Sequence, residues 1–368
     1  MKKIIICTIF LFVIVFTIFV IKIIETKNNI LYDNDELSFY TQLSDLTTNR
    51  EDERFEERLL TLKEVSIMVG AFEQKENGYI GNGVTVAIID SGIYPHPDLT
   101  EPDNKIIAFK DFVNDYNKPY DDTGHGTAIA GIIAGNGKVD SDCEGIAPGI
   151  NIVAVKVLDK HNKANLQRLI EGIEWVIDNK EVFNILIMNI SISLEIDGSW
   201  DINLLNAVIK KAIDKGILII TSVGNCYTPQ CSKKYSPANI EGVVTVGAIS
   251  EMQYNTYFEY SVANFSCWWN SDGISKPDLV APGMNILTLK SDLYYKGDNN
   301  FQMQELKNYY IKHTGTSQAT AVVSGVAAIL FEKNSNATSQ EIIQILKERC
   351  FKIISPLEQQ GNGFIYIN

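Results

Sequence analysis

Basic residues are scarce in this sequence relative to acidic ones. The 368 residues include 32 lysines and arginines against 45 aspartates and glutamates, which gives a formal net charge of −13 at pH 7. A chain of this charge repels the phosphates of nucleic acids instead of releasing their counterions. The sequence also lacks a basic stripe, a P-loop and any cysteine–histidine spacing typical of zinc sites. We therefore expect no nucleic-acid partner.

Internal repeats and low-complexity stretches are absent as well. Hydrophobic residues make up 45% of the chain and charged residues 21%, which is typical of a globular enzyme with a sizeable core. The part of the chain beyond the N-terminal segments is long for one domain, but single-domain α/β enzymes reach this size. We therefore expect one large catalytic-type domain over residues 60–368.

Cysteine is infrequent, with six in the chain. Cys7 lies within an apolar N-terminal run, where it serves as a small apolar residue. An odd number remains, so at least one cysteine stays free or pairs between chains. Cys226 and Cys231 flank a short turn-rich loop. A small disulfide between them in an oxidising compartment and two unpaired side chains both fit this spacing.

One long uncharged run stands at residues 4–21, directly after Lys2 and Lys3. Its length meets the lower bound of about 17 residues for a helix that crosses a bilayer. A cleaved signal peptide would have a shorter apolar region and small residues at its exit. We predict a transmembrane anchor at residues 1–24 that contacts membrane lipid through residues 4–21, with a cleaved signal and a secreted protein as the alternative. The preceding lysines favour placing the rest of the chain outside the cell.

An acidic segment at residues 25–59 follows the predicted anchor. It contains clusters such as Arg50–Arg58 and has few large apolar side chains after Tyr40. Such a segment cannot bury enough apolar surface to fold as a domain. We interpret it as a stalk or a short pro-segment.

Short apolar runs rich in valine and isoleucine alternate with segments of helical spacing in the remaining chain. Continuous apolar character is typical of parallel strands that are covered on both faces. The predicted strands are Val84–Ile89, Ile152–Val157, Ile185–Ile192, Ile217–Val223 and Val243–Ile249. The predicted helices between them include Asn165–Asn179 and Asn203–Lys215. This alternation predicts an α/β fold, a parallel β-sheet with helices on both faces.

Three chemically distinct side chains stand at the edges of predicted elements. Asp90 ends an apolar run, His125 follows a glycine and opens a small-residue helix, and Ser317 precedes a second apolar helix. An acid, an imidazole and a hydroxyl are the components of a Ser-His-Asp triad. Of the four histidines, His125 alone lies in such a motif, whereas His161 and His313 lie in polar contexts. The chain order Asp, His, Ser is the order found in subtilisin.

From about Leu60 to the C-terminus the sequence resembles the subtilisin-like serine proteases. Several segments match the pattern of that family in order. They are Gly78–Gly92, His96–Leu99, His125–Gly131, Gly145–Pro148, Ala154–Val157, Gly216–Asn225, Lys276–Gly283 and Gly315–Ala319. The resemblance implies a serine endopeptidase that acts on proteins or peptides and requires no cofactor for its chemistry.

The resemblance assigns a role to each of these residues. Ser317 is the nucleophile, His125 takes its proton, and Asp90 orients the imidazole. The side chain of Asn225 and the backbone N–H of Ser317 stabilise the oxyanion of the tetrahedral intermediate. All four residues are present, which disfavours a catalytically silent binding protein on the same fold.

The resemblance also implies residues that bind the substrate and a possible ligand of calcium. Ser191, Ile192 and Ser193 match the segment that pairs with the peptide backbone, and Gly224 matches a wall of the pocket for the residue before the scissile bond. Asp98 matches one ligand of a structural Ca²⁺ site. The loop at residues 136–142 has suitable oxygens but differs in length from the family's calcium loop, so a solvated acidic loop is an equal alternative.

Three positions depart from the family pattern. Gln318 replaces the methionine that many relatives carry after the nucleophile, Ala321 replaces a proline, and Ala128 replaces a second histidine. None of the three supplies triad chemistry, so we expect activity to survive. The substrate is then either general protein or one leader peptide, as for the lantibiotic leader peptidases that some members of this family resemble.

Overall fold

The computed structural model describes residues 58–163, 165–196, 202–226, 234–254, 257–271, 273–297 and 308–368. The predicted anchor at residues 1–24, nearly all of the acidic segment and Cys231 lie outside these ranges. Within these ranges, no helix combines the length and the apolar character needed to cross a bilayer.

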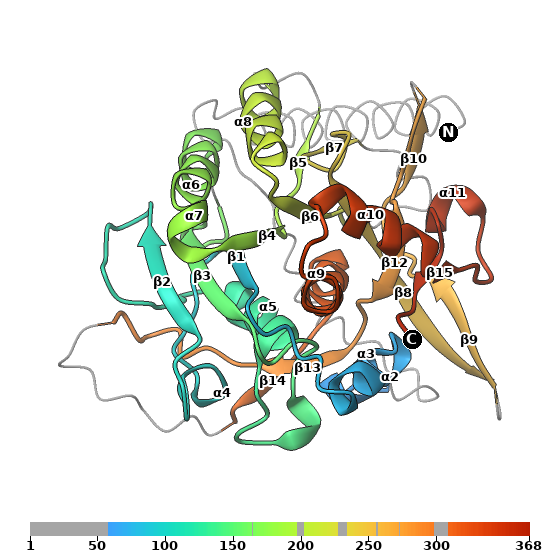
Figure 1. The fold of residues 1–368 in the computed structure, drawn as a ribbon, viewed down its shortest axis with the longest axis horizontal. Helices are drawn as coiled ribbons and strands as arrows, with labels where there is room; N and C mark the ends of the chain where they lie inside the picture. The colour runs from blue at the N-terminus through green and yellow to red at the C-terminus, as the bar shows by residue number, and fades with distance from the viewer. Residues whose placement is uncertain are drawn as a thin grey trace, which may run out of the picture. The chain divides into compact units, whose positions relative to one another are not determined.

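A largely parallel sheet organises the described chain (Figure 1). Its strands lie in the order β15-β16-β12-β8-β6-β4-β1-β3-β2, with β9 paired to β8. Only the pairs β8–β9 and β15–β16 are antiparallel among these described strands. The strands are β1 (Thr85–Asp90), β2 (Ile106–Asp111), β3 (Asn151–Lys156), β4 (Ile185–Ile190), β6 (Leu218–Ser222), β8 (Val244–Tyr254), β9 (Tyr257–Val262), β12 (Leu279–Pro282), β15 (Cys350–Phe351) and β16 (Phe364–Ile365). Each of the five predicted strands is confirmed, as β1, β3, β4, β6 and β8.

The remaining strands form two-stranded pairs beside the main sheet. These are β5 (Leu194–Glu195) with β7 (Tyr235–Ser236), β10 (Trp269–Ser271) with β11 (Ile274–Lys276), and β13 (Ile286–Leu289) with β14 (Tyr310–His313). The helices are α2 (Leu62–Met68), α3 (Ala71–Glu76), α4 (Pro97–Thr100), α5 (His125–Ala134), η1 (Ser141–Cys143), α6 (Leu166–Asp178), α7 (Lys180–Phe183), α8 (Ile202–Asp214), α9 (Thr316–Lys333), α10 (Ser339–Glu348) and α11 (Leu357–Gln360).

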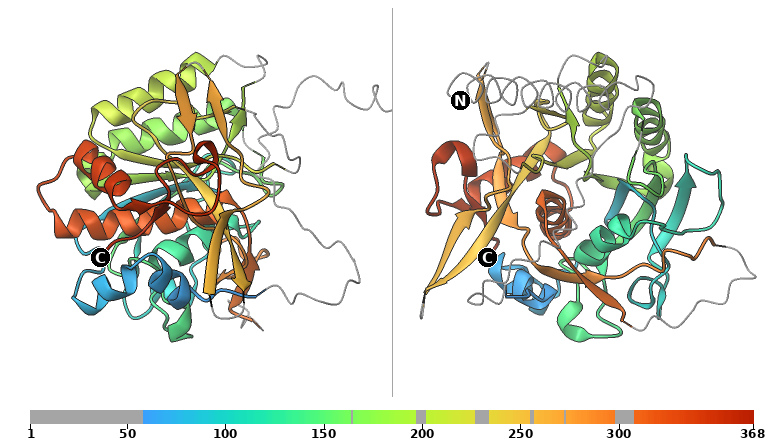
Figure 2. Two further views of the ribbon diagram at one scale, coloured as in Figure 1. Left: turned by 90° about the vertical axis from the view of Figure 1, so that its right-hand side faces the viewer. Right: turned by 180° about the vertical axis from the view of Figure 1, so that it is seen from behind.

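Helices cover both faces of the sheet, as predicted (Figures 1 and 2). The side chains of β1 alternate between two hydrophobic cores. Val86 and Ile88 join the core that contains α5 and α9, whereas Ala87 and Ile89 join the core that contains α6 and α8. Because both faces of β1 are buried, its sequence shows a continuous apolar run and no alternation.

Backbone hydrogen bonds attach Leu60 to the chain beside β13. The Leu60 N–H donates to the Asn285 carbonyl, and the Leu287 N–H donates to the Leu60 carbonyl, each at 2.8 Å. These bonds attach residue 60 alongside β13. The folded part therefore includes the residue at which the predicted domain begins.

The candidate site residues lie where strands end and helices begin. Asp90 is the last residue of β1, and Asn225 follows the end of β6. His125 is the first residue of α5, and Ser317 is the second residue of α9. The carboxyl ends of parallel strands share one edge of a sheet, so these side chains collect at that edge.

Candidate active site

Asp90 and His125 form a buried hydrogen-bonded pair. The imidazole Nδ1 of His125 lies 2.8 Å from Oδ1 and 2.9 Å from Oδ2 of Asp90. Asp90 is fully buried, and His125 is only 3% exposed. Because Nδ1 faces the carboxylate, the other ring nitrogen, Nε2, is left to act as the base.

The carboxylate changes the basicity of the imidazole. Burial by itself lowers the pKa of His125, because it disfavours the charged ring. The negative charge and hydrogen bond of Asp90, reinforced by the charge of Asp121, outweigh burial and raise the pKa above its ordinary value of 6.5. His125 is therefore a stronger base than a free histidine.

Ser317 lies in the first turn of α9 with its side chain almost buried, at 8% exposure of the residue. Its hydroxyl donates to the Ser191 carbonyl at 3.4 Å, a long hydrogen bond. No hydrogen bond between Ser317 and His125 occurs in the described part of the chain. Such catalytic contacts are often loose without substrate and tighten in the Michaelis complex.

A buried polar chain joins β4 to α9 behind Ser317. The Ser324 hydroxyl donates to the side-chain Oδ1 of Asn189 at 2.9 Å, and the Asn189 side-chain Nδ2 donates to the Ser191 hydroxyl at 3.1 Å. The Ser191 hydroxyl in turn donates to the Ser317 carbonyl at 3.4 Å. Asn189 and Ser324 were missed by the sequence analysis, because they lie inside apolar elements and contact each other only in the folded chain.

A further missed residue, Asp121, fixes the start of the helix that carries His125. Its carboxylate accepts hydrogen bonds from the Ser91 hydroxyl and the Gly124 N–H at 2.9 Å each. It also accepts the N–H and hydroxyl of Thr127, at 2.9 and 2.7 Å. A carboxylate at a helix N-terminus satisfies otherwise unpaired N–H groups. The only sequence signal for this role is the turn-forming Asp-Asp-Thr-Gly segment before His125.

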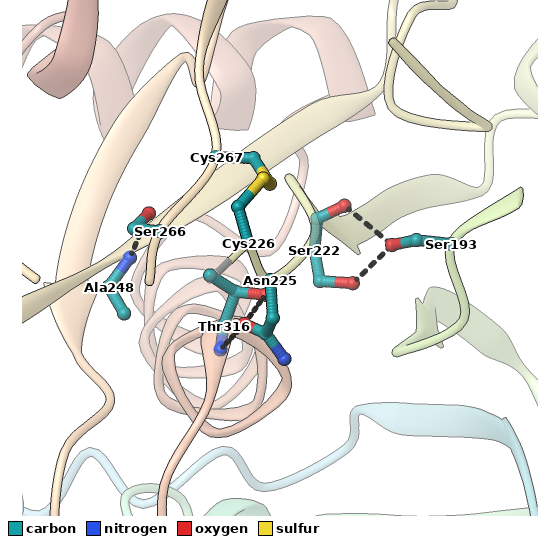
Figure 3. Close-up of a disulfide and its surroundings, with 8 residues drawn as sticks. All are labelled: Ser193, Ser222, Asn225, Cys226, Ala248, Ser266, Cys267 and Thr316. Atoms are coloured by element: carbon teal, nitrogen blue, oxygen red, sulfur yellow. Dashed lines mark hydrogen bonds between the residues drawn. A yellow bond between two sulfur atoms is a disulfide. The ribbon is translucent and has the colours of Figure 1, made fainter. Parts of the chain in front are cut away.

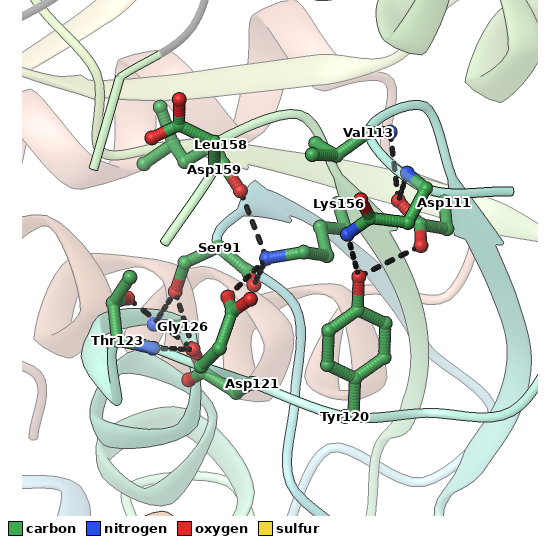
Figure 4. A network of polar contacts seen from close by, with 12 residues as sticks. Ser91, Asp111, Val113, Tyr120, Asp121, Thr123, Gly126, Lys156, Leu158 and Asp159 are labelled. Carbon is green, nitrogen blue, oxygen red and sulfur yellow. Dashed lines mark hydrogen bonds and ion pairs between the residues drawn. The ribbon is translucent and has the colours of Figure 1, made fainter. Parts of the chain in front are cut away.

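The buried side chain of Lys156 connects the turn before His125 to the sheet (Figure 4). Lys156 is fully buried, and its ammonium donates to the carbonyls of Ser91 and Leu158 at 2.5 and 2.9 Å. It also pairs with Asp122 at 2.7 Å and lies 5.0 Å from the Tyr120 ring centroid. These contacts hold the chain immediately after β1, the strand whose last residue is Asp90.

Asn225 faces the N-terminus of α9 (Figure 3). Its Oδ1 accepts the Thr316 backbone N–H at 3.0 Å and the Thr316 hydroxyl at 2.9 Å. Because Oδ1 is held by two donors, the amide Nδ2 is directed to the other side. The backbone N–H of Ser317 lies in the first helical turn, where N–H groups have no partner inside the helix. Both predicted oxyanion donors, the Asn225 amide and the Ser317 N–H, therefore lie at the start of α9, and their role stays a prediction.

The disulfide at this site matches neither of the two alternatives that the sequence spacing left open, a Cys226–Cys231 bond or two unpaired side chains. Cys226 pairs with Cys267, whereas the sequence suggested Cys231 as a partner (Figure 3). The Cys226 N–H donates to the Phe265 carbonyl at 2.6 Å, and the Cys267 N–H donates to the Gly224 carbonyl at 3.0 Å. These backbone bonds bring the two cysteines together from distant parts of the chain. Proximity in sequence therefore did not identify the disulfide partner of Cys226.

The predicted substrate-binding segment follows β4 directly. Ser191 and Ile192 are buried, whereas Ser193 is half-buried. Gly224 lies against Tyr235, and a Cβ at Gly224 would approach the tyrosine ring to 2.8 Å. Tyr235 is therefore a further candidate wall of the pocket, missed because it follows a loop that carries no motif. The binding roles of these residues stay predictions.

Asp98, the possible calcium ligand, is held by two protein donors in the structure. Its Oδ1 accepts the Val139 N–H at 2.9 Å, and its Oδ2 accepts the Tyr310 hydroxyl at 2.8 Å. In the described ranges no group of three or more acidic, histidine or cysteine side chains is placed to hold a metal ion. Each carboxylate oxygen of Asp98 therefore has a protein donor, and the possible role of Asp98 as a calcium ligand stays a prediction.

His313, which the sequence placed merely in a polar context, lies in the electrostatic field of the Asp90–His125 pair. Burial first, and then repulsion from His125, lower the pKa of His313 to about 4, against an opposing effect of Asp90. His313 ends β14, four positions before the nucleophile. It is therefore neutral over the pH range in which His125 titrates.

Known proteins match both the sequence and the fold. The Subtilase family model matches residues 81–363. Serine protease AprX of Bacillus subtilis (strain 168) is 38% identical over 276 residues, which cover 73% of this chain and 61% of the relative. Subtilisin E of the same organism is 30% identical over 292 residues, which cover 78% of this chain and 64% of that protein.

Solved structures agree with these matches. The S41 Psychrophilic Protease superimposes with a TM-score of 0.65 and 25% identity, over 78% of this chain and 92% of that chain. The chain spans less than two thirds of the length of AprX and of Subtilisin E. By its motifs, its fold and the extent of the family match, this chain belongs to the subtilase family.

Proposed function

We propose that this protein is a serine endopeptidase that hydrolyses peptide bonds through Asp90, His125 and Ser317. The observation that carries the proposal is the buried Asp90–His125 pair, whose raised histidine pKa suits a general base. Names of relatives such as serine protease AprX and Subtilisin E support the same activity. The chemistry requires no cofactor.

The reaction begins when the Ser317 hydroxyl attacks the carbonyl carbon of the scissile peptide and His125 takes the hydroxyl proton. The Asn225 amide and the Ser317 N–H stabilise the oxyanion that forms. The C–N bond then breaks, and His125 returns the proton to the leaving amine. Water, activated by His125, hydrolyses the acyl-enzyme and restores Ser317. Asp90 stabilises the imidazolium in both halves of the reaction.

Covalent labelling of Ser317 tests the proposal. A fluorophosphonate probe reacts with an activated serine, so we expect the wild-type protein to be labelled and Ser317→Ala to be unlabelled and inactive, with its fold intact by circular dichroism. Ser335→Ala, an exposed serine after α9, is the matched control and should label like the wild type. A folded wild-type protein that takes up no label would overturn the proposal in favour of a silent binding protein.

The substrate class is protein or peptide, held along Ser191, Ile192 and Ser193 with Gly224 beside the residue before the scissile bond. This assignment follows the family pattern of strand addition. A cleavage profile against a peptide library distinguishes the two substrate alternatives. Broad cleavage indicates general protein, whereas one strongly preferred sequence indicates a leader peptide.

The proposed location is the outer face of the cell membrane, with residues 1–24 as a single-pass anchor. The support is the uncharged run at residues 4–21 and the Cys226–Cys267 disulfide, which is typical of an oxidising compartment. Secretion after removal of the N-terminal run is the alternative.

A further inference from the structure

The backbone on both sides of Asn225 is hydrogen-bonded to one short segment that follows β9. Before Asn225, the Gly224 carbonyl accepts the Cys267 N–H at 3.0 Å. After Asn225, the Cys226 N–H donates to the Phe265 carbonyl at 2.6 Å. The predicted oxyanion residue therefore lies between two backbone contacts with the same segment.

That segment is anchored to β8 at Ala248 (Figure 3). The Ser266 hydroxyl accepts the Ala248 N–H at 3.1 Å, and the Ala263 N–H donates to the Ala248 carbonyl at 2.9 Å. Ser266 also forms an isolated antiparallel bridge with Asn225. Because β8 lies between β6 and β12 in the sheet, the segment has a fixed position from which it holds Asn225.

The Cys226–Cys267 disulfide is the covalent part of this attachment. One of its sulfurs belongs to the residue directly after Asn225, and the other belongs to the segment after β9. Cys226 is 5% exposed and Cys267 is fully buried, and both pack with Val223 and Trp269 in one apolar cluster. The backbone hydrogen bonds open and close with thermal motion, whereas the covalent bond stays closed until it is reduced.

The side chain of Asn225 is attached to α9 through Oδ1. This oxygen accepts the backbone N–H and the hydroxyl of Thr316, one residue before Ser317. The direction of Nδ2 therefore depends on two points, the oxygen that Thr316 holds and the backbone that the segment after β9 holds. If the backbone is released, the amide can turn about its oxygen and Nδ2 changes direction.

We propose that the Cys226–Cys267 disulfide positions Asn225 for catalysis, so that full peptidase activity requires this bond to be oxidised. The inference rests on the proposed function, in which Asn225 Nδ2 stabilises the oxyanion. Such a donor is effective because it is aimed at the developing charge before the reaction begins. A dithiol reductant breaks the S–S bond by passing two electrons and two protons to the sulfurs of the two cysteines, and it becomes a disulfide itself.

A double-mutant cycle tests the proposal in the full-length protein. We expect Cys226→Ser with Cys267→Ser to lower kcat on a peptide p-nitroanilide about tenfold, a part of the roughly 10²–10³-fold loss seen when subtilisin loses its oxyanion asparagine. KM should change by less than about threefold, since the effect belongs to the transition state. In the Asn225→Ala background, the same two substitutions should change kcat by less than about twofold. Cys350→Ser, at a free cysteine, is the matched control and should keep the kcat of the wild type.

Two further measurements separate positioning from loss of stability. All rates are measured at a temperature at which circular dichroism shows each variant to be folded. If the serine pair does not fold, Cys226→Ala with Cys267→Val replaces it, because these side chains keep the apolar packing. In the wild type, dithiothreitol is raised until mass spectrometry after alkylation shows the bond to be open. The kcat should then fall by the same factor and recover on reoxidation.

Three outcomes would overturn the proposal. The first is an unchanged kcat in the folded variants or in the reduced wild type. The second is an equal loss of kcat with and without the Asn225 side chain, which would indicate a general loosening of the fold. The third is a change confined to KM, which would mean that Gly224 and not Asn225 had moved. Fluorophosphonate labels the oxidised wild type only if the proposed function holds, so a labelled protein with any of these outcomes refutes this inference alone.

Discussion

At the scale of single residues, the site depends on how burial and charge set the pKa of two nearby histidines. Asp90 raises the pKa of His125 despite burial, whereas burial and His125 lower the pKa of His313 to about 4. The two imidazoles therefore titrate in separate pH ranges. Only His125 changes its charge near neutral pH.

This separation predicts the pH dependence of activity. His125 must be neutral to accept the Ser317 proton, so activity falls as pH drops through its pKa. Because that pKa is raised, we expect the acid limb of kcat/KM to have its midpoint above pH 6.5. His313 is already neutral there, so the limb should fit one ionisation. Asp90→Asn should move the midpoint to lower pH and reduce kcat by roughly 10⁴-fold. An acid limb of kcat/KM that can be fitted only with two ionisations would contradict the assignment of His125 as the one titrating group.

Gln318 also predicts resistance to oxidation. A methionine beside the nucleophile can be converted by peroxide to a bulkier, polar sulfoxide, whereas glutamine contains no sulfur. We expect the wild type to retain its activity in dilute hydrogen peroxide and Gln318→Met to lose activity with time. Residual hydrolysis after timed exposure is the measurement. Equal inactivation of both proteins would show that another group is the target.

At the scale of elements, long-range links hold the site loops in place. The Cys226–Cys267 disulfide spans 41 positions and joins the segment after β6 to the segment after β9. The Tyr310–Asp98 hydrogen bond joins β14 to α4 across 212 positions. Each link joins segments that are far apart in the sequence, so we expect each to contribute to stability.

Loss of the disulfide should destabilise the fold. For a closed loop of this length, Cys267→Ser should lower the free energy of unfolding by about 2–4 kcal/mol, measured by urea denaturation. The cross-link restricts the conformations of the unfolded chain, and the variant lacks this restriction. Cys350→Ser, at a free cysteine, is the control and should change stability by less than about 1 kcal/mol. Equal stability of Cys267→Ser and wild type would show that the bond does not form in solution.

Loss of the Tyr310 hydroxyl should likewise be costly. Tyr310→Phe leaves Oδ2 of the buried Asp98 without its side-chain donor, which should lower the free energy of unfolding by about 1–3 kcal/mol. Tyr294→Phe, at an 80% exposed tyrosine, should change it by no more than about 0.5 kcal/mol. If EDTA destabilised the wild type as much as Tyr310→Phe does, a cation and not the phenol would hold Asp98.

At the scale of the whole molecule, we predict that the part of the chain with the candidate site residues is active without the N-terminal segment at residues 1–24. All candidate site residues lie after Leu60, whose backbone bonds attach it to the chain beside β13. We expect the full chain to fractionate with membranes and to resist extraction by alkaline carbonate, because a spanning helix requires detergent. A chain that starts at Arg58 should be soluble and should cleave peptides at the full-length rate. Recovery of the natural protein from culture medium with a new N-terminus near Glu25 would make it a secreted enzyme.

Local patterns in the sequence were enough to predict the strands of the sheet and the candidate site residues. Apolar runs predicted the strands β1, β3, β4, β6 and β8, because a strand buried on both faces selects for apolar residues along its whole length. Short motifs identified Asp90, His125, Ser317 and Asn225, because each side chain stands at a turn whose glycines and small residues are local in the chain.

Contacts between residues far apart in the sequence became visible in the folded structure. The fold paired Cys226 with Cys267, gave Asp98 the hydroxyl of Tyr310 where a Ca²⁺ ion had been considered, and placed His313 in the field of His125. These contacts join segments far apart in sequence, and periodicity within one segment carries no information about the path of another. The path is set by the packing of the whole sheet and its helices.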